Sequence, residues 1–311
     1  MTRRLFVARA INQLSIAWVL IFGAIFLVTL VTSSSAFGID ARIYVEATRT
    51  WLAGGDPWSI QDTGVRFGAP PTSLLAFAPL AWLPNAAVER LVPILGAAAL
   101  GFAIARTKAG WWWLLSVPAL EGVWVGSLDP VAIGLVAALP LSGRASLPAS
   151  VLGAAGAIAR IFAVVPLFVL GHRRALAILL GVVVLSAPFL PWGLFVSRLP
   201  ELGRLFADET DGGKGVSRVP WLIVPTVVAL IAIGRRDGAW LAVPALWPSS
   251  QLHYGILALP AASPIFAAFA ASPLEAPLAL GAIGVAVVRA IEGRLDPWSW
   301  VPSRWRPQGE P

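Results

Sequence analysis

The stretch that decides the fold is AINQLSIAWVLIFGAIFLVTLVTSSSAFGI, residues 10–39, in which no side chain is charged. A helix needs about 20 apolar residues to cross the hydrocarbon core of a bilayer, so this stretch can span one. Further stretches without Asp, Glu, Lys or Arg follow at 67–88, 175–197, 219–234 and 238–274. The sequence therefore predicts an all-α polytopic integral membrane protein in contact with membrane lipids.

Composition and charge favour the same class. Hydrophobic residues make up 58% of the 311 positions and charged residues 13%. A soluble domain carries about 25% charged residues, so this chain could not cover a globular surface with polar groups. The net charge of +7 comes largely from short basic clusters between apolar runs, at 106–108, 172–174 and 235–236. Such clusters are typical of cytoplasmic loops, so we expect no nucleic-acid partner.

The first span is expected to stay attached to the chain. Arg3, Arg4 and Arg9 resemble the basic start of a signal peptide. The apolar run that follows is longer than the roughly 7–15 residues of a signal core, which favours an uncleaved span. The small residues at 33–36 leave cleavage open as an alternative. The chain has no cysteine, which excludes disulfides and thiolate metal sites.

With the N-terminal arginines on the cytoplasmic side, the apolar runs predict a bundle of about ten transmembrane or re-entrant helices. We expect them within one membrane domain, residues 1–311. The expected helices lie at about 14–33, 86–105, 111–124, 129–141, 147–158, 161–170, 174–190, 220–233, 239–249, 252–270 and 275–290. Several are short and interrupted by proline, as in segments that dip into a bilayer and line a cavity.

Two polar stretches are expected on the outer face. The first, 34–84, would carry short interfacial helices at 45–53 and in the proline-rich piece 69–84. The second, 191–219, also has helix-like apolar spacing, and a tail follows at 291–311. We expect the protein in the cytoplasmic (inner) membrane of a bacterium, with its functional site on the outer face.

Asp40 opens the first outer stretch, in GIDARIYVEATRTWLAGGDPW (38–58), directly after the first span. Position alone favours a solvated aspartate that caps the following helix, because a charge at the membrane interface meets water. An aspartate at this interface could also take a proton from an attacking hydroxyl group. Both interpretations are open at the level of residues.

The motifs that follow Asp40 carry a resemblance. The chain continues through IY at 43–44, WLAGGDPW at 51–58 and RFGAPPTSLLAFAPLAWLP at 66–84. In order and spacing these resemble the start of glycosyltransferase family 87, membrane enzymes of the GT-C superfamily. The resemblance implies a GT-C-like bundle. No Gly-rich phosphate loop or zinc-ligand spacing stands out in the sequence, so we expect no cofactor or metal. The resemblance also implies transfer of a hexose, mainly mannose, from a polyprenyl-phosphate donor to the hydroxyl of a lipid or glycan acceptor.

Three later segments are similar to other elements of the family: VGSLDPVAIGLVAALPL (125–141), AIARIFAVVPLFVLGHRR (157–174) and WPSSQLHYGILALP (247–260). Under the resemblance Asp40 is the general base, and Arg160 and His253 bind the donor phosphate. An arginine suits that role because its planar fork matches a phosphate. The expected substrate pocket is lined by Tyr44, Asp56, Asp129 and Tyr254.

Other interpretations of these residues stay open. Arg160 could form a buried pair with Asp129 or Glu121, because an arginine in apolar surroundings needs an anion. His253 could be a helix-end histidine bonded to a carbonyl group. Asp56 could simply shape the Gly-Asp-Pro turn.

Alternatives for the whole chain are also open. Trp58 and Asp129 stand where family 87 has tyrosine and asparagine, so a catalytically inactive relative that serves as a structural membrane subunit is one alternative. Broken apolar helices would also suit a transporter or lipid flippase. No internal repeat supports that class. Three acidic residues of the second outer stretch could hold a divalent ion, although a solvated loop is favoured: Asp208, Glu209 and Asp211.

Overall fold

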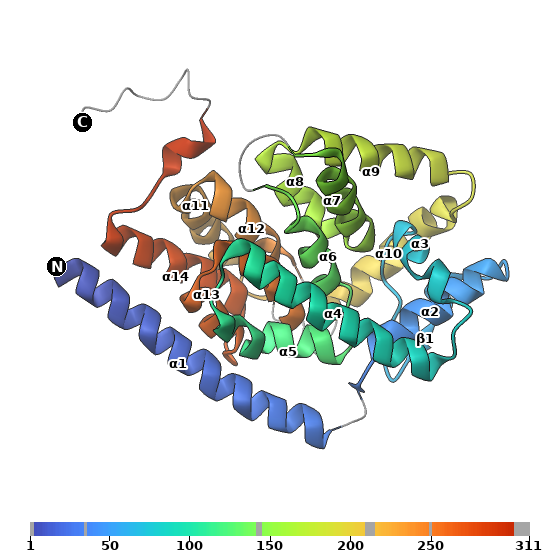
Figure 1. The fold of residues 1–311 in the computed structure, drawn as a ribbon, viewed down its shortest axis with the longest axis horizontal. Helices are drawn as coiled ribbons and strands as arrows, with labels where there is room; N and C mark the ends of the chain where they lie inside the picture. Colours follow the sequence, from blue (N-terminus) through green and yellow to red (C-terminus); the bar gives the residue numbers. More distant parts are fainter. Residues whose placement is uncertain (1–2, 34–35, 141–144, 209–214, 249–250, 302–311) are drawn as a thin grey trace.

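The computed structural model describes residues 3–33, 36–140, 145–208, 215–248 and 251–301, with the backbone alone at 205–208. Helices dominate, and a two-stranded hairpin accompanies them (Figure 1). The α-helices are α1 (Arg3–Thr32), α2 (Ile39–Leu52), α3 (Thr72–Phe77), α4 (Asn85–Thr107), α5 (Val117–Trp124), α6 (Asp129–Val136), α7 (Leu147–Ala159), α8 (Val164–Leu170), α9 (Arg173–Ser186), α10 (Trp192–Asp208), α11 (Ile223–Ile233), α12 (Arg235–Leu246), α13 (Pro264–Ala270) and α14 (Pro277–Glu292). The strands are β1 (Gln61–Asp62) and β2 (Val65–Arg66), and 3₁₀ helices include η2 (Pro57–Ser59), η5 (Ile161–Ala163), η7 (Pro220–Leu222), η8 (Leu252–Ala261) and η9 (Pro297–Trp300).

Within these residues, two helices are long and apolar enough to cross a membrane, α1 and α4. The pair α5–α6 is bent by 112° at its break and makes a third span if the pair is counted as one. The other apolar helices that come near this length have 10–17 residues. The bundle of about ten crossings is therefore not confirmed, because most apolar runs end before the roughly 20 residues that a full span requires.

The helices lie close to where the apolar runs predict them. α4 occupies Asn85–Thr107 against an expected 86–105. α1 begins earlier than expected, at Arg3, because no glycine or proline interrupts the residues before the apolar run. The single helix expected at 252–270 is divided into η8 and α13, since Ala262 between them has a left-handed backbone with φ of 48°.

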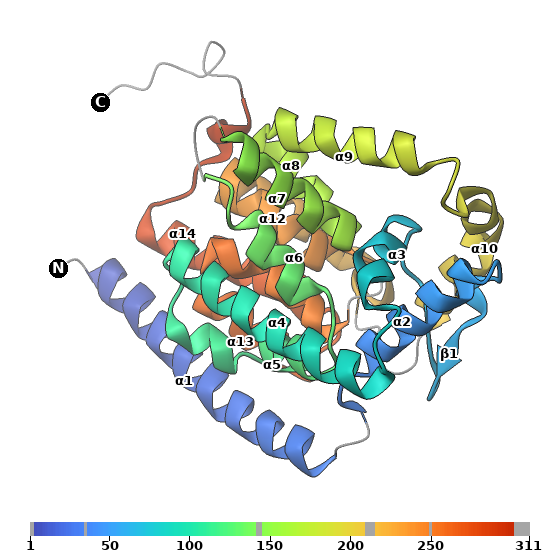
Figure 2. The same ribbon diagram turned by 45° about the vertical axis from the view of Figure 1, so that its right-hand side comes forward.

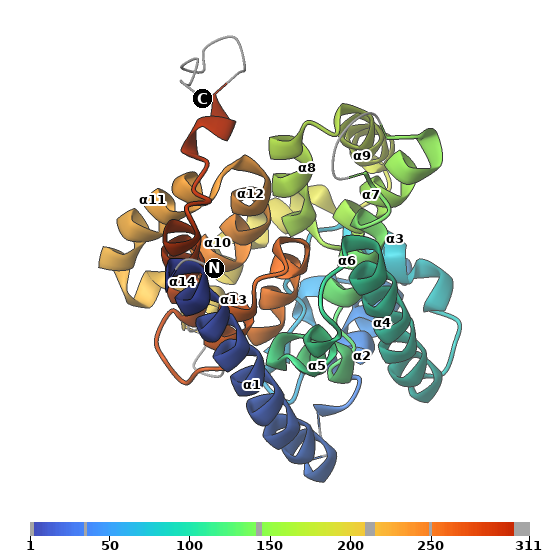
Figure 3. The same cartoon turned by 60° about the vertical axis from the view of Figure 1, so that its left-hand side comes forward.

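Small residues let the central helices approach closely. A Cβ atom added to Gly134 of α6 would lie 2.7 Å from the backbone oxygen of Ala99 in α4. One added to Gly156 of α7 would lie 2.8 Å from the backbone oxygen of Ala132 in α6. Contacts of this kind are typical of helices that pack in a membrane. α1 instead runs along the outside of the bundle against α5, α13 and α14 (Figure 3).

The two ends of the molecule differ in charge and structure. Figures 1 and 2 show α2, α3, the hairpin and α10 together at one end, and the start of α1 and the end of α14 toward the other. The basic loops meet away from α2: the Arg235 guanidinium donates to the Val169 carbonyl, and Thr107 and His172 border one small pocket. Clustering of the basic loops at one end is the pattern expected for a membrane protein.

α2, α3 and the hairpin build a second hydrophobic core beside the main one. Its fully buried side chains include Ile43 on α2, Phe67 after the hairpin, and Leu74 and Phe77 on α3. Tyr44 packs its ring edge-on against Phe67, with ring centroids 5.2 Å apart. This core fixes the face of α2 that carries Asp40 and Tyr44, so the fold orients the first outer stretch.

Candidate functional site

The site brings together the first turns of α2, the break between α5 and α6, the residue after α7 and the start of η8. The backbone amides of Gly38 and Asp40 donate to the carbonyls of Trp124 and Val125, each at 2.9 Å. The chain can turn back after α5 because Gly126 has a φ of 71°, a region that glycine adopts without strain. These contacts place the start of α2 directly against the break between α5 and α6.

Arg160 and Asp129 form the centre of the site. Arg160 directly follows α7, and its Nε lies 2.9 Å from Asp129 Oδ1, while its Nη2 donates to Asp129 Oδ2 at 2.9 Å. The Arg160 side chain is 11% exposed and the Asp129 side chain is 0% exposed. The pairing that the sequence left open is therefore with Asp129, whose two carboxylate oxygens both lie in close contact with the guanidinium and supply its counter-charge.

Neighbouring hydroxyl groups complete the shell of Arg160. Its Nη1 donates to Tyr44 Oη at 2.8 Å, and its Nη2 donates to Ser127 Oγ at 3.0 Å. The Ser127 hydroxyl in turn donates to Asp129 Oδ2 at 2.9 Å. Every nitrogen of the guanidinium thus has a close partner, so the position of Arg160 is fixed without any ligand.

Asp40 lies beside this network but outside it. Its carboxylate has no hydrogen-bond or ion-pair partner in the part of the chain that the structure describes. Burial raises the pKa of the Asp40 carboxyl above its ordinary value of 3.8, and the charges of His253 and Arg160 act in the opposite direction. An unpaired carboxylate with a raised pKa is a stronger base than an exposed aspartate.

Tyr44, one helical turn after Asp40, presents its hydroxyl to the same space. Burial raises the pKa of Tyr44 to about 12, so the hydroxyl keeps its proton at neutral pH. Because the Tyr44 oxygen accepts from Arg160, its own O–H remains able to donate to a bound molecule. Tyr44 therefore links the fixed guanidinium to whatever occupies the neighbouring cavity.

His253, at the start of η8, stands behind Arg160. Its Nδ1 lies 3.4 Å from Glu121 Oε2, and its Nε2 lies 3.4 Å from Asp129 Oδ2. The side chain is buried and does not line the cavity described below. The structure thus places His253 between two carboxylates, with its ring nitrogens facing neither a carbonyl group nor the cavity, and a direct contact with a donor phosphate is not supported.

A cavity of about 350 Å³ opens beside these residues. Its polar lining includes Asp40, Tyr44 and Arg160, with Arg66 and Gln251 also at its wall. The remaining wall is mainly apolar and includes four residues of α10, Trp192, Phe195, Leu199 and Leu202. The cavity therefore has charged and polar side chains at one part of its wall and a long apolar surface at the other.

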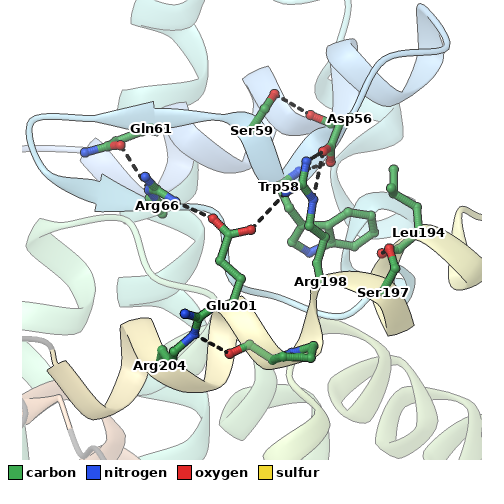
Figure 4. A network of polar contacts seen from close by, with 11 residues as sticks. Asp56, Trp58, Ser59, Gln61, Arg66, Leu194, Ser197, Arg198, Glu201 and Arg204 are labelled. Atoms are coloured by element: carbon green, nitrogen blue, oxygen red, sulfur yellow. Dashed lines mark hydrogen bonds and ion pairs between the residues drawn. The ribbon is translucent and has the colours of Figure 1, made fainter.

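The expected pocket residues are only partly brought together. Tyr44 and Tyr254 line the cavity, whereas Asp129 lies behind Arg160. Asp56 is absent from the lining and accepts from the backbone amide of Trp58 at 2.9 Å, capping η2. Figure 4 shows the Asp56 carboxylate also bound to Arg198 of α10. Asp56 thus shapes its turn and ties the first outer stretch to α10.

Arg66 is a lining residue that the sequence analysis missed. It ends β2, directly before the proline-rich piece that begins at residue 69. The signal in the sequence was that Arg66 is the basic residue at the start of the motif 66–84, which resembles the glycosyltransferase family. The direction of the Arg66 side chain, however, depends on the hairpin. Only the pairing of Gln61 with Arg66 across the two strands shows where its side chain projects.

No metal-binding group of three or more His, Asp or Glu side chains occurs among the described residues. The acidic cluster considered from the sequence lies outside the described side chains: Asp208, Glu209 and Asp211. The site as described therefore offers a base, a fixed cation and an apolar wall.

In comparisons with known proteins, no family model matches the chain, and neither a curated protein nor a solved structure matches it. The resemblance of the residues after Asp40 to glycosyltransferase family 87 therefore stays a prediction. The case for a function rests on the chemistry of the site.

Proposed function

We propose that the chain is a membrane glycosyltransferase of GT-C type. It moves a hexose, most often mannose, from a polyprenyl-phosphate donor to a hydroxyl of a lipid or glycan acceptor on the outer face of a bacterial cytoplasmic membrane. The observation that carries the proposal is the carboxylate of Asp40, which lines the cavity beside Arg160 and has no partner among the described residues.

Asp40 acts as the general base. A hydroxyl becomes a better nucleophile when a base accepts its proton in the transition state, which contributes typically about 10²–10⁴-fold to the rate. Burial raises the pKa of Asp40 toward the working pH, and this strengthens the carboxylate as a proton acceptor. An aspartate engaged in an ion pair would be a much weaker base.

The sugar is transferred in a single displacement. The acceptor oxygen forms a bond to the anomeric carbon of the sugar while its proton passes to the Asp40 carboxylate. The bond between that carbon and the phosphate oxygen breaks, and its electron pair leaves with the polyprenyl phosphate. One displacement inverts the configuration at the anomeric carbon, by analogy with inverting glycosidases.

Arg160 and Tyr44 support the departing phosphate. The Arg160 guanidinium lines the cavity while Asp129 lies behind it, so the ion pair is held rigid with its positive group nearer to the reacting groups. Tyr44 keeps its proton and can donate it to a phosphate or sugar oxygen. His253 and Asp129 are positioning residues in this scheme, since they touch Arg160 and do not line the cavity.

The apolar wall suits a donor that carries a long lipid chain. The helix α10 contributes Trp192, Phe195, Leu199 and Leu202 to this wall. A soluble nucleotide-sugar would leave such a surface exposed to water, which is unfavourable. A lipid-linked donor covers it, so the composition of the cavity favours the polyprenyl class.

The experiment is a transfer assay in proteoliposomes with radiolabelled polyprenyl-phosphate mannose. Wild type is compared with Asp40→Asn and with Glu46→Gln, a control on the same helix whose carboxylate does not line the cavity. We expect Asp40→Asn to lower transfer about a hundredfold or more and Glu46→Gln to change it little. Equal activity in wild type and Asp40→Asn would show that Asp40 is not the general base. No turnover with mannose, glucose or arabinose donors would favour a structural subunit or a transporter.

A further inference from the structure

The cavity has two basic residues in its described lining, Arg160 and Arg66, and they differ in how their guanidinium groups are used. Every nitrogen of Arg160 has a protein partner, as shown above. Arg66 donates from Nε to Gln61 Oε1 at 3.0 Å and from Nη1 to Glu201 Oε1 at 2.9 Å (Figure 4). Its Nη2 has no partner among the residues that the structure describes.

Glu201, the anion beside Arg66, has a second cation of its own. Arg198, one turn earlier on α10, donates from Nη1 to Glu201 Oε2 at 2.9 Å. Arg198 also donates from Nε to Asp56 Oδ2 at 3.1 Å. Arg66 can therefore turn from Glu201 to another anion without leaving Glu201 unpaired. If Arg66 turns to a bound anion, Glu201 and Asp56 share Arg198, so neither carboxylate is left without a cation.

The apolar wall next to Arg66 has the form of a stripe. The four cavity-lining side chains of α10 recur at helical spacing, so they lie along one face of the helix: Trp192, Phe195, Leu199 and Leu202. Leu202 belongs to the second hydrophobic core and Trp192 and Phe195 pack partly against that core, while Leu199 is 46% exposed. All four side chains also line the cavity. A cation beside an apolar stripe that lines the cavity matches a molecule with an anionic head and a long apolar chain.

We propose that Arg66 binds the phosphate group of a lipid phosphate whose chain lies along this stripe of α10. The inference rests on the proposed function, in which the donor and the released carrier are both such lipids. It adds a phosphate contact from a residue outside the predicted site to the support that Arg160 and Tyr44 give. Arg66 reads the phosphate through its free Nη2 and by exchanging Glu201 for a phosphate oxygen, as its planar fork permits.

Binding of three probes to the full-length protein in nanodiscs tests the assignment: undecaprenyl phosphate, undecaprenol and inorganic phosphate. Wild type should bind undecaprenyl phosphate far more tightly than undecaprenol. Arg66→Gln should weaken binding of undecaprenyl phosphate about tenfold or more, because a charge-assisted hydrogen bond is lost, and should leave binding of undecaprenol unchanged. Arg66→Lys, which keeps the charge, should restore part of the affinity and shows that the variant folds.

Arg204→Gln is the matched control, since Arg204 lies on α10, donates to the Pro200 carbonyl and does not line the cavity. It should change the affinity for undecaprenyl phosphate less than about twofold, as is usual for a substitution at an exposed side chain. Equal losses in Arg66→Gln and Arg204→Gln would overturn the assignment, because the effect would then come from the general positive charge at this end of the molecule and not from a contact of Arg66. Displacement of the lipid by an equal concentration of inorganic phosphate would also overturn it, because the site would then serve the free anion.

The inference and the proposed function fail separately. Binding of undecaprenyl phosphate that depends on Arg66, without any sugar transfer, would reject the glycosyltransferase and retain the lipid-phosphate site. Transfer that depends on Asp40, with normal binding of undecaprenyl phosphate by Arg66→Gln, would reject Arg66 and retain the enzyme.

Discussion

Replacing Asp129 by asparagine should destabilise the protein strongly, because it removes the counter-charge of a buried arginine. Asparagine keeps the size of the side chain and can still accept from Ser127, so the change is chiefly one of charge. Asp129 supplies both close carboxylate contacts of Arg160, at 2.9 Å each, and its side chain is 0% exposed. Leaving one partner of such a buried pair without the other costs about 3–5 kcal/mol.

Two further variants define the scale of this effect. Tyr44→Phe removes one hydrogen bond from Arg160, 2.8 Å long, and leaves the ion pair in place. A hydrogen bond to a charged group contributes about 1.5–3 kcal/mol, so Tyr44→Phe should cost less than Asp129→Asn. The double variant Arg160→Leu with Asp129→Leu removes both charges and should be more stable than Asp129→Asn, because no buried charge is left unpaired.

The free energy of unfolding can be measured in detergent micelles by titration with dodecyl sulfate, followed by circular dichroism. We expect the order of stability to be wild type, Tyr44→Phe, then Asp129→Asn, with the double leucine variant above Asp129→Asn. A loss under about 1 kcal/mol in Asp129→Asn would refute the reasoning, because it would mean that water reaches Arg160 and the pair is effectively at a surface.

Three other outcomes are expected. Burial raises the folded-state pKa of Asp40, so the contribution of Asp40 to stability is highest below its unfolded-state pKa and is lost as pH rises through the folded-state pKa. Asp40→Asn cannot ionise and should therefore melt at a higher temperature than wild type. The difference in melting temperature should grow with pH. Transfer activity should rise with pH along an acidic limb that lies above 3.8, because only the ionised Asp40 accepts a proton; a rate independent of pH there would exclude Asp40 as base. Gly126→Ala should lower both stability and transfer more than Gly171→Ala, since both sites have positive φ but only at Gly126 would the new Cβ meet a neighbour, Ala41 Cβ at 2.9 Å. Thermal melts and the transfer assay compare the two variants, and equal effects would show that the start of α2 tolerates displacement.

The helices were predictable because their signals are local. Apolar runs bounded by basic clusters place α4 within a few residues, and the isolated aspartate after the first span draws attention to Asp40. The number of membrane crossings could not be predicted in the same way. Several apolar helices are too short to cross a bilayer, and their path depends on neighbouring helices.

The contacts within the site could be predicted only as alternatives. Arg160 and Asp129 lie 31 positions apart in sequence, and the sequence left Asp129 and Glu121 both open as partners. The break between α5 and α6 decides which of the two carboxylates faces the end of α7. The orientations of Arg66 and of the α10 stripe depend on a two-residue hairpin and on an ion-pair network across 135 positions. Such long-range pairings leave no periodic trace in a single sequence.

The pair between Asp129 and Arg160 also explains why Asp40 can remain a free base. Two carboxylates lie near one fixed guanidinium, and Asp129 already contacts it through both carboxylate oxygens. If Asp129 lost its charge, Arg160 would turn its full attraction on Asp40, which would lower the pKa of Asp40 and weaken it as a base. Asp129→Asn should therefore reduce transfer and also move the acidic limb of the pH profile to lower pH. A limb that stays in place while activity falls would mean that Asp129 acts only by supporting the fold. A limb that moves would show that one carboxylate holds the cation so that the other can take the proton.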